Sequence, residues 1–219
     1  MAARTLVVVA LAFGLMAVGA QPAEAALKKK HVVQVQRNLK NLGIWLQVDG
    51  VEGPRTRQAV CAGRRLLGYR KATRWRLRWR DVRALRRADR LPKPQNGRNY
   101  LSVDKTCQMV YQAKRGKWRR VVRASTGKAG HRTPSGSYSI TWRWPGWHNS
   151  SKYPSDSGNG NMYNSMYFKS GGYAVHGSRS VPWYPASHGC VRISVRKANQ
   201  LYRSTPVGTP IYIYGQNWG

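Results

Sequence analysis

Residues 173–193 read YAVHGSRSVPWYPASHGCVRI, and the chemistry of the chain is concentrated in this stretch. It begins with three residues typical of a short strand, which ends at His176 and Gly177. Near its end, Cys190 lies between a His-Gly pair and Val191-Arg192. A thiol acts as a nucleophile only as its thiolate, and imidazolium and guanidinium neighbours lower its pKa. We therefore predict that Cys190 is a nucleophile with a lowered pKa and that His176 is its general base.

The residues beside this pair have predicted supporting roles. Gly189 allows a tight turn, and the backbone N–H groups of Gly189 and Cys190 are expected to donate to an oxyanion. No acid lies near His176 in the sequence, so a backbone carbonyl is expected to orient it. His188 could support His176 or shape the turn, and Arg192 could orient the loop or hold a substrate carboxylate. The candidate supporting residues are Gly177, Ser187, His188, Gly189 and Arg192.

The alternatives for Cys190 are a structural disulfide and a zinc site. Zinc requires three or four ligands, and only His176, His188 and Cys190 cluster here in the sequence. We therefore predict no metal site and no cofactor.

The region around this stretch, from residue 98 to 215, is predicted to be rich in β-structure. Short strands are expected at 100–103, 109–111, 118–122, 136–144, 173–175 and 210–214, with turns at Asp104 and Arg115-Gly116. A loop rich in Gly, Ser and Asn spans residues 145–161 and holds Trp147 and Tyr153. Loops of this length in compact domains are usually functional or mobile.

Residues 31–70 are predicted to form a helical module. Val32, Val35, Leu39 and Leu42 recur at helical spacing, and Gly43 ends that helix. A turn at 49–54 follows, with Pro54 at the first position of a second helix. Asp49 and Glu52 in this turn are too few for a calcium site.

Residues 71–97 are predicted to form a basic helix and a linker. Trp75, Trp79, Val82, Leu85 and Ala88 recur at three- and four-residue steps within the arginine-rich stretch 64–90. The favoured interpretation is a helix between domains with its apolar stripe buried and its arginine face in solvent. A basic amphipathic helix could also lie on an anionic membrane surface or contact a nucleic acid.

The composition excludes several classes of function. The chain has 219 residues, 39 Lys plus Arg, 7 Asp plus Glu and a formal net charge of +32. So few acids, scattered along the chain, argue against a two-carboxylate glycosidase and against a carboxylate-rich metal site. Nine Trp and twelve Tyr against two Phe suit binding surfaces, because these rings pair an apolar body with a polar tip.

The N-terminal residues 1–25 are predicted to be a signal peptide. Arg4 precedes an apolar run at 6–18, and Ala23-Glu24-Ala25 offers a cleavage site. Cleavage after Ala25 is favoured over cleavage after Ala20. The apolar run is shorter than the ~20 residues that span a membrane. We therefore expect the protein to be exported to the cell wall, periplasm or extracellular space, where disulfides form.

The C-terminal region resembles the L,D-transpeptidases of the YkuD type. The residues that carry the resemblance are His176-Gly177 followed by Ser187-His188-Gly189-Cys190-Val191-Arg192-Ile193, the stretches 125–127 and 133–138, and the closing strand 208–213. The resemblance implies a mostly-β domain that forms a thioester acyl-enzyme on peptidoglycan stem peptides. It also implies that a carbapenem acylates Cys190.

Residues 35–60 resemble the peptidoglycan-binding domain 1 family, a small three-helix module. The matching residues are Val35-Gln36, Leu39, Leu42-Gly43 and the turn Val48-Asp49-Gly50-Val51 with Gly53-Pro54, Thr56 and Ala59-Val60. The alternative is a helical hairpin that only packs on the next domain. The expected fold class is therefore α+β, with a three-helix N-terminal module and a sandwich-like, mostly-β catalytic domain.

Three cysteines are an odd number for an exported protein, which indicates one pair and one free thiol. Because Cys190 must stay reduced to act as a nucleophile, we predict a disulfide between Cys61 and Cys107. The alternative is two separate buried thiols.

These observations predict an exported cysteine L,D-transpeptidase acting in cell-wall cross-linking. The alternatives are an L,D-carboxypeptidase with water as the acceptor and a non-enzymatic, basic wall- or polyanion-binding protein. The expected partners are peptidoglycan stem peptides and wall polyanions, with no nucleic acid and with peripheral membrane contact as a further option. The sequence predicts neither the acceptor nor an oligomeric state.

Overall fold

The computed structural model describes residues 27–69, 76–88, 90–94, 98–156 and 158–216. The predicted signal peptide, residues 1–25, lies outside these described residues. No helix within them is long and apolar enough to cross a membrane.

Three helices pack together at the N-terminus: α1 (Lys29–Asn41), α2 (Pro54–Leu66) and α3 (Trp79–Arg87). The turn between α1 and α2 is held by the buried side chain of Gln36. Its amide donates to Asp49 Oδ1 at 2.7 Å and to Thr56 Oγ1 at 3.0 Å, and its carbonyl accepts from Gly50 N at 2.8 Å. Asp49 is thus occupied by hydrogen bonds within the turn, and its pKa is lowered by the backbone N–H of Val51 and the Gln36 amide.

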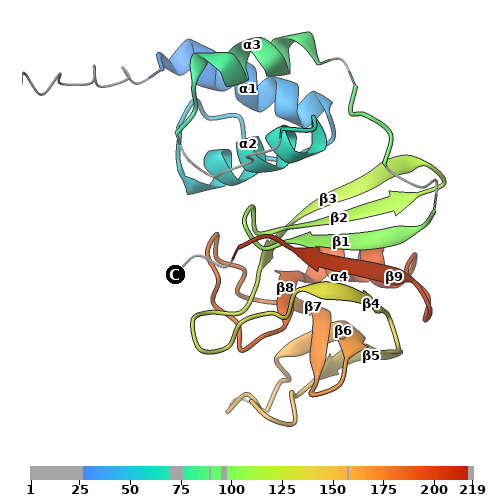
Figure 1. Cartoon of the computed structure of the whole chain (residues 1–219). Helices are drawn as coiled ribbons and strands as arrows, with labels where there is room; N and C mark the ends of the chain where they lie inside the picture. Colours follow the sequence, from blue (N-terminus) through green and yellow to red (C-terminus); the bar gives the residue numbers. More distant parts are fainter. Residues whose placement is uncertain (1–26, 70–75, 89, 95–97, 157, 217–219) are drawn as a thin grey trace, which may run out of the picture.

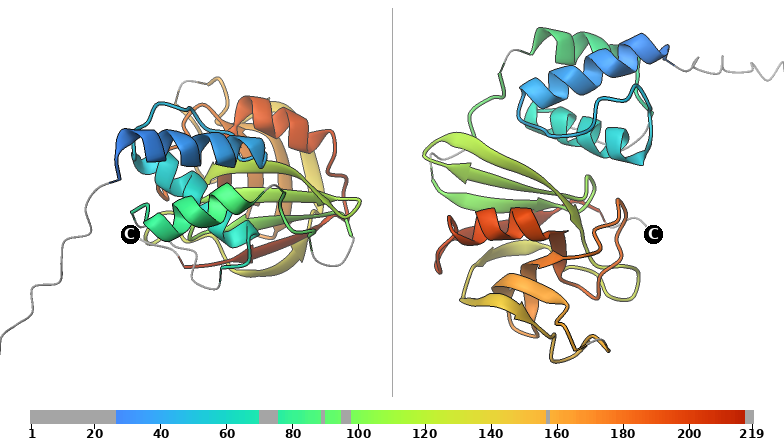
Figure 2. Two further views of the ribbon diagram at one scale, coloured as in Figure 1. Left: turned by 90° about the horizontal axis from the view of Figure 1, so that it is seen from above. Right: turned by 180° about the vertical axis from the view of Figure 1, so that it is seen from behind.

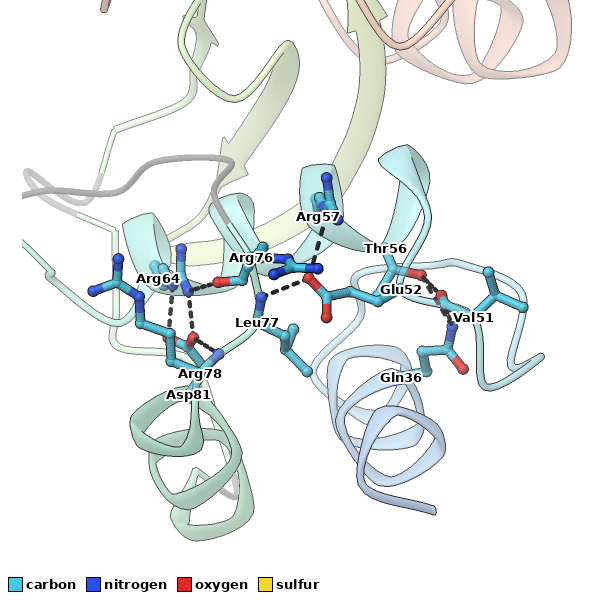
Figure 3. Close-up of polar contacts among 10 residues, drawn as sticks. All are labelled: Gln36, Val51, Glu52, Thr56, Arg57, Arg64, Arg76, Leu77, Arg78 and Asp81. Atoms are coloured by element: carbon cyan, nitrogen blue, oxygen red, sulfur yellow. Dashed lines mark hydrogen bonds and ion pairs between the residues drawn. The ribbon is translucent and has the colours of Figure 1, made fainter. Parts of the chain in front are cut away.

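The basic helix α3 packs with α1 and α2, although the sequence pattern predicted a connector at this position (Figures 1 and 3). The guanidinium of Arg64 on α2 meets the carboxylate of Asp81 on α3 in a buried ion pair, with Nε 2.6 Å from Oδ1. Asp81 also accepts from the N–H of Arg78 at the start of α3, at 2.8 Å. Val82 and Leu85 are buried as expected, but Trp79 is exposed.

Within the described residues, nine strands form one continuous sheet in the order β4-β9-β1-β2-β3-β8-β7-β6-β5. The order along the chain is β1 (Tyr100–Asp104), β2 (Met109–Lys114), β3 (Lys117–Ser125), β4 (Gly136–Ser139), β5 (Trp142–His148), β6 (Met162–Lys169), β7 (Tyr173–Ser178), β8 (Val191–Ser194) and β9 (Pro210–Tyr214). The β1–β9 and β7–β8 pairs are parallel, and the other pairs are antiparallel.

The catalytic domain is mostly β as predicted, and its sandwich-like shape is formed by one bent sheet that curls around a shared core. Leu101 and Ile211 from the first half lie in the same buried cluster as Met166, Val175 and Ile193 from the second half. Helix α4 (Val195–Tyr202) closes this core with Ala198 and Leu201, and it is visible from behind in Figure 2.

Several elements differ from the sequence prediction. The expected strand 136–144 divides into β4 and β5, because Ile140 N bonds to Thr209 O near β9 while Thr141 N bonds to Tyr167 O on β6. Strand β5 continues to His148, so the loop begins later than residue 145. Strands β6 and β8 and helix α4 were not predicted.

The helical module and the sheet share one hydrophobic core. Met109, Tyr111 and Val121 of the sheet belong to the same buried cluster as Leu39 and Val60 of the module. Burial of this shared apolar surface stabilises the contact between the helical module and the sheet. The two parts are therefore held together by packing as well as by their linker.

Three specific contacts add to this core. The predicted disulfide between Cys61 on α2 and Cys107 in the β1–β2 turn is present. Arg65 Nε lies 2.8 Å from Asp104 Oδ2, and Gln58 Nε2 donates to the carbonyl of Gln108 at 2.7 Å. The module is therefore fixed on the sheet (Figure 1).

Candidate active site

His176 and Cys190 are brought to one face of the sheet by the parallel pairing of β7 with β8. The register pairs Val175 with Val191 and His176 with Arg192. Because side chains alternate along a strand, His176, Arg192 and the preceding Cys190 project to the same side. Both His176 and Cys190 line a single open cavity of about 1010 Å³.

His176 is buried, and the carbonyl of Gly177 orients its ring. Nδ1 of His176 lies 2.9 Å from that oxygen, which is a backbone carbonyl of the kind expected in place of an acid. Because a carbonyl oxygen only accepts, Nδ1 carries the proton and the Nε2 lone pair remains to take one. Burial, helped by the charge of Arg192, lowers the pKa of His176 to about 4, so the ring is neutral at neutral pH.

Cys190 is the free cysteine among the described residues, and its pKa differs from the prediction. Burial raises the pKa of the thiol above its ordinary value, although the Ala174 N–H and the charge of Arg192 both lower it. The thiol donates to the carbonyl of Gly172, with Sγ 3.3 Å from the oxygen. The resting pair is therefore a neutral thiol and a neutral imidazole, rather than a preformed thiolate–imidazolium pair.

The turn before Cys190 is held by Ser187. Its hydroxyl donates to the carbonyl of Cys190 at 2.5 Å and accepts from Gly189 N at 3.1 Å. The Gly189 N–H is thus engaged by Ser187 within the turn, and its role as an oxyanion donor stays a prediction. Gly189 has φ +117°, and a Cβ there would lie 2.7 Å from a ring carbon of Tyr173, so the position requires glycine.

Residues 125–133 clamp this turn from the other side. Thr133 Oγ1 accepts from Gly127 N at 2.9 Å and donates to the carbonyl of Gly189 at 2.7 Å. Lys128 N donates to the carbonyl of Ser187 at 3.0 Å. The stretches that carried the family resemblance therefore position the turn, although they supply no reacting group.

His188 contacts aromatic residues at the mouth of the cavity. Its ring stacks on Tyr153, with centroids 4.2 Å apart, and meets His131 edge-on at 4.8 Å. Tyr153 belongs to the loop rich in Gly, Ser and Asn. The contacts therefore favour a role for His188 in shaping the turn and the loop over support of His176.

The cavity wall is strongly cationic. Arg132, Lys152, Arg179 and Arg192 line it, and no Asp or Glu is among its lining residues. Such a wall favours ligands with carboxylates. Among the described residues no three His, Cys, Asp or Glu side chains gather to hold a metal ion.

Sequence reasoning missed Arg132, Lys152 and Arg179 as cavity residues. Arg179 donates to the carbonyl of Gly160 at 2.9 Å, and its guanidinium lies 3.7 Å from the ring centroid of Trp147. These residues lie far from Cys190 in the sequence and are single cations in a chain full of them, so no local pattern distinguishes them.

Comparison with known proteins agrees with this geometry. The family described as the YkuD L,D-transpeptidase catalytic domain matches residues 98–213. This chain belongs to that family. Among curated proteins, none matches the chain.

Two solved structures of L,D-transpeptidases are similar over nearly the whole chain. The crystal structure from Xylanimonas cellulosilytica is 32% identical with a TM-score of 0.57, covering 89% of this chain and 98% of that one. The crystal structure from Stackebrandtia nassauensis, at 21% identity and a TM-score of 0.53, covers 90% and 98% and supports the fold alone. At this coverage the similarity includes the helical module as well as the sheet.

Proposed function

We propose that this protein is an exported L,D-transpeptidase that cross-links peptidoglycan stems through a thioester on Cys190. The observation that supports this most directly is the pair formed by His176 and Cys190. The histidine is neutral, oriented by a backbone carbonyl and placed on the same sheet face as the free thiol, in a cationic cavity. Stem peptides carry carboxylates, so the charge of the cavity suits them.

The proposed first half-reaction forms the acyl-enzyme. Cys190 Sγ attacks the carbonyl that joins an L-centre to the terminal D-residue, while Nε2 of His176 takes the thiol proton. The tetrahedral intermediate collapses with cleavage of the C–N bond, and the imidazolium returns its proton to the leaving amine. Since Ser187 occupies the Gly189 N–H, the Cys190 N–H remains the proposed oxyanion donor of the predicted pair.

The second half-reaction transfers the stem to an acceptor amine. The amine attacks the thioester carbonyl and loses a proton to His176, the C–S bond breaks, and the proton returns to the Cys190 sulfur. Water in place of the amine would give a carboxypeptidase through the same acyl-enzyme.

The products formed from purified tetrapeptide muropeptides test this proposal. We expect mass analysis to show a cross-linked dimer that has lost one terminal D-residue. Loss of that residue without a dimer would instead support the carboxypeptidase. Unchanged muropeptides would contradict both activities and support a non-enzymatic wall-binding protein.

The rate of acylation is expected to depend weakly on pH around neutrality. Because the pKa of His176 is lowered to about 4, the base stays neutral as the pH falls through 6.5. The rate of adduct formation with a carbapenem, followed by intact mass, should fall only as the pH approaches about 4. A fall centred near pH 6.5 would show that His176 titrates like an exposed histidine.

We also propose that the helical module binds wall polyanions through α3. Arg80, Arg83, Arg86 and Arg87 are exposed on this helix. Since exposed charges are screened over ~8 Å at physiological ionic strength, the binding should weaken strongly with salt.

Co-sedimentation of the full chain with isolated wall at low and high salt checks this expectation. The full chain is required because the module shares its core with the sheet. The triple variant Arg80→Gln/Arg83→Gln/Arg87→Gln should bind less at low salt. Binding that is insensitive to salt would point to recognition in a groove of the module instead.

A further inference from the structure

The turn between β1 and β2 is fastened to the helical module. Its Cys107 is joined to Cys61 on α2 by the disulfide, and Gln58 of α2 donates to the carbonyl of Gln108 at 2.7 Å. Gln108 follows the bonded cysteine directly and is fully buried. Because both bonds to α2 are made at adjacent residues, the position of Gln108 is fixed by the module as well as by the sheet.

The side chain of Gln108 forms hydrogen bonds through both its oxygen and its nitrogen. Its Nε2 donates to Thr126 Oγ1 and to the carbonyl of Lys105, each at 2.7 Å. Its Oε1 accepts from the N–H of Thr126, also at 2.7 Å. Thr126 is fully buried and follows β3 directly. The amide of Gln108 therefore holds both the main chain and the hydroxyl of Thr126.

Thr126 in turn holds the segment that leads to Cys190. Its carbonyl accepts from Ala186 N at 2.9 Å and from Ser187 N at 3.0 Å. The hydroxyl of Ser187 then donates to the carbonyl of Cys190 at 2.5 Å. Gln108 is thus connected to the main chain of Cys190 through Thr126 and Ser187.

The turn between β1 and β2 has a second connection to the same segment. Lys105 is buried, and its Nζ donates to the carbonyl of Thr133 at 3.2 Å. Thr133 Oγ1 donates to the carbonyl of Gly189 at 2.7 Å. Two separate routes therefore lead from the turn that carries Cys107 to the residues around Cys190.

The backbone of Gln108 adopts a conformation that residues other than glycine rarely take, with φ 54°. Such conformations persist where the surrounding structure fixes them, and they are found more often at functional sites. Here the disulfide at the preceding residue, the bond from Gln58 and the two bonds to Thr126 supply that constraint. This conformation distinguishes Gln108 from an ordinary buried amide.

We propose that Gln108 is a positioning residue for the Cys190 thiol, and that the disulfide makes the helical module part of this positioning. Coupling between separated residues is carried by bonded and packed networks of this kind. Gln108 and Thr126 are not among the described residues that line the Cys190 cavity, so they act through the main chain and not on a substrate. The inference rests on the proposed function, because the reaction concerned is the acylation of Cys190.

Acylation by a carbapenem, followed by intact mass at several concentrations, gives an affinity and a rate constant that test the proposal. Gln108→Asn keeps an amide and tolerates a positive φ, but it is one methylene shorter and no longer reaches both polar atoms of Thr126. We expect the rate constant to fall by about tenfold, since a reacting group misplaced by ~1 Å can cost about 10²-fold. The affinity should not change, because the residues that line the cavity are the same.

Gln112→Asn is the matched control for this variant. Gln112 is also a buried glutamine, and its amide donates to Ser204 at 2.9 Å and to Thr205 at 3.2 Å, beyond the end of α4. We expect Gln112→Asn to lower the thermal midpoint and to keep the native rate constant. Equal rate constants for the native chain and both variants would overturn the proposal, and so would equal losses in the two variants.

Replacing Thr126 tests the bond to its hydroxyl. Thr126→Ser keeps the hydroxyl that Gln108 contacts, whereas Thr126→Val removes it with little change of shape. We expect Thr126→Ser to be acylated at close to the native rate and Thr126→Val to be acylated several-fold more slowly. Equal rates for the two variants would contradict a role for this bond.

A double-mutant cycle tests the part played by the disulfide. Cys61→Ala/Cys107→Ala, measured below its thermal midpoint, should be acylated more slowly than the native chain. Adding Gln108→Asn to this variant should cost much less than it costs the native chain, because both changes loosen the same bonds. Losses of rate that multiply in full would show that the disulfide does not act through Gln108.

Hydrogen exchange separates this inference from the proposed function, because it requires no substrate. The N–H groups of Ala186 and Ser187 bond to Thr126, so the peptide that contains them should exchange faster in Gln108→Asn than in Gln112→Asn. If this difference is seen but the native chain is not acylated, the positioning stands and the transpeptidase proposal fails. If the native chain is acylated and the two variants match in exchange and in rate constant, only the positioning role is wrong.

Discussion

Replacing His176 with alanine is expected to slow the acylation of Cys190 by about 10²–10⁴-fold, the usual contribution of a positioned general base. The effect should be this large because burial raises the pKa of the Cys190 thiol, so little thiolate forms without a base. Adduct formation with a carbapenem, followed by intact mass over time, measures the rate. Cys190→Ala provides the blank, with no adduct expected.

His188→Ala is the matched control for this variant. His188 is also a histidine in the cavity, but its ring stacks on Tyr153 and meets His131 edge-on at the mouth. We therefore expect a much smaller loss of rate from His188→Ala than from His176→Ala. The reverse order would assign the base to His188 and contradict the account of the site.

Removing the disulfide with the double variant Cys61→Ala/Cys107→Ala is expected to cause a large loss of stability. The bond joins residues 46 positions apart. In the chain-entropy model, a loop of this length contributes about 4 kcal/mol to the free energy of unfolding. For a protein of this size, that corresponds to a fall of roughly 10 °C in the thermal midpoint.

Thermal unfolding of the double variant, the native chain and Cys190→Ala checks this prediction. Cys190→Ala removes a free thiol and should keep a midpoint close to that of the native chain. A double variant as stable as the native chain would show that the shared core alone holds the module on the sheet. Reduction of the native chain should reproduce the loss seen in the double variant.

Part of this fold could be predicted from the sequence because local pattern and chemistry agree. The alternation of apolar and polar residues in β1 and the turn glycines between the elements are local signals. Strand β6 has no such signal: Asn164 has φ 47°, and the register with its neighbours shifts along the strand. Strand β6 forms by pairing with β5 and β7. Those strands lie outside the segment, so the residues of β6 alone do not predict it.

The position of α3 could not be predicted for a similar reason. Arg64 and Asp81 are 17 residues apart, and both are buried. In an arginine-rich stretch, an arginine that pairs with a buried carboxylate looks like its neighbours. Which of these arginines is buried beside a carboxylate depends on how the helices pack, so the sequence alone does not identify it.

In the candidate site, too, the sequence indicates the reactive side chains, whereas their surroundings depend on the fold. The candidate nucleophile and its candidate base could be named from residues 173–193, since thiol and imidazole chemistry is carried by the side chains themselves, and their roles stay predictions. The direction of the Cys190 pKa was predicted wrongly, because desolvation outweighs the nearby Arg192. The engagement of the Gly189 N–H by Ser187 is likewise a product of the folded turn.

The most direct measurement of the central claim is the mass of the protein during reaction with a tetrapeptide stem. Brief incubation, acid quenching and peptide mapping should show the stem, less its terminal D-residue, attached to the peptide that contains Cys190. Release of the D-residue with the adduct on any other residue, or with no adduct on the native chain, would contradict a thioester at Cys190.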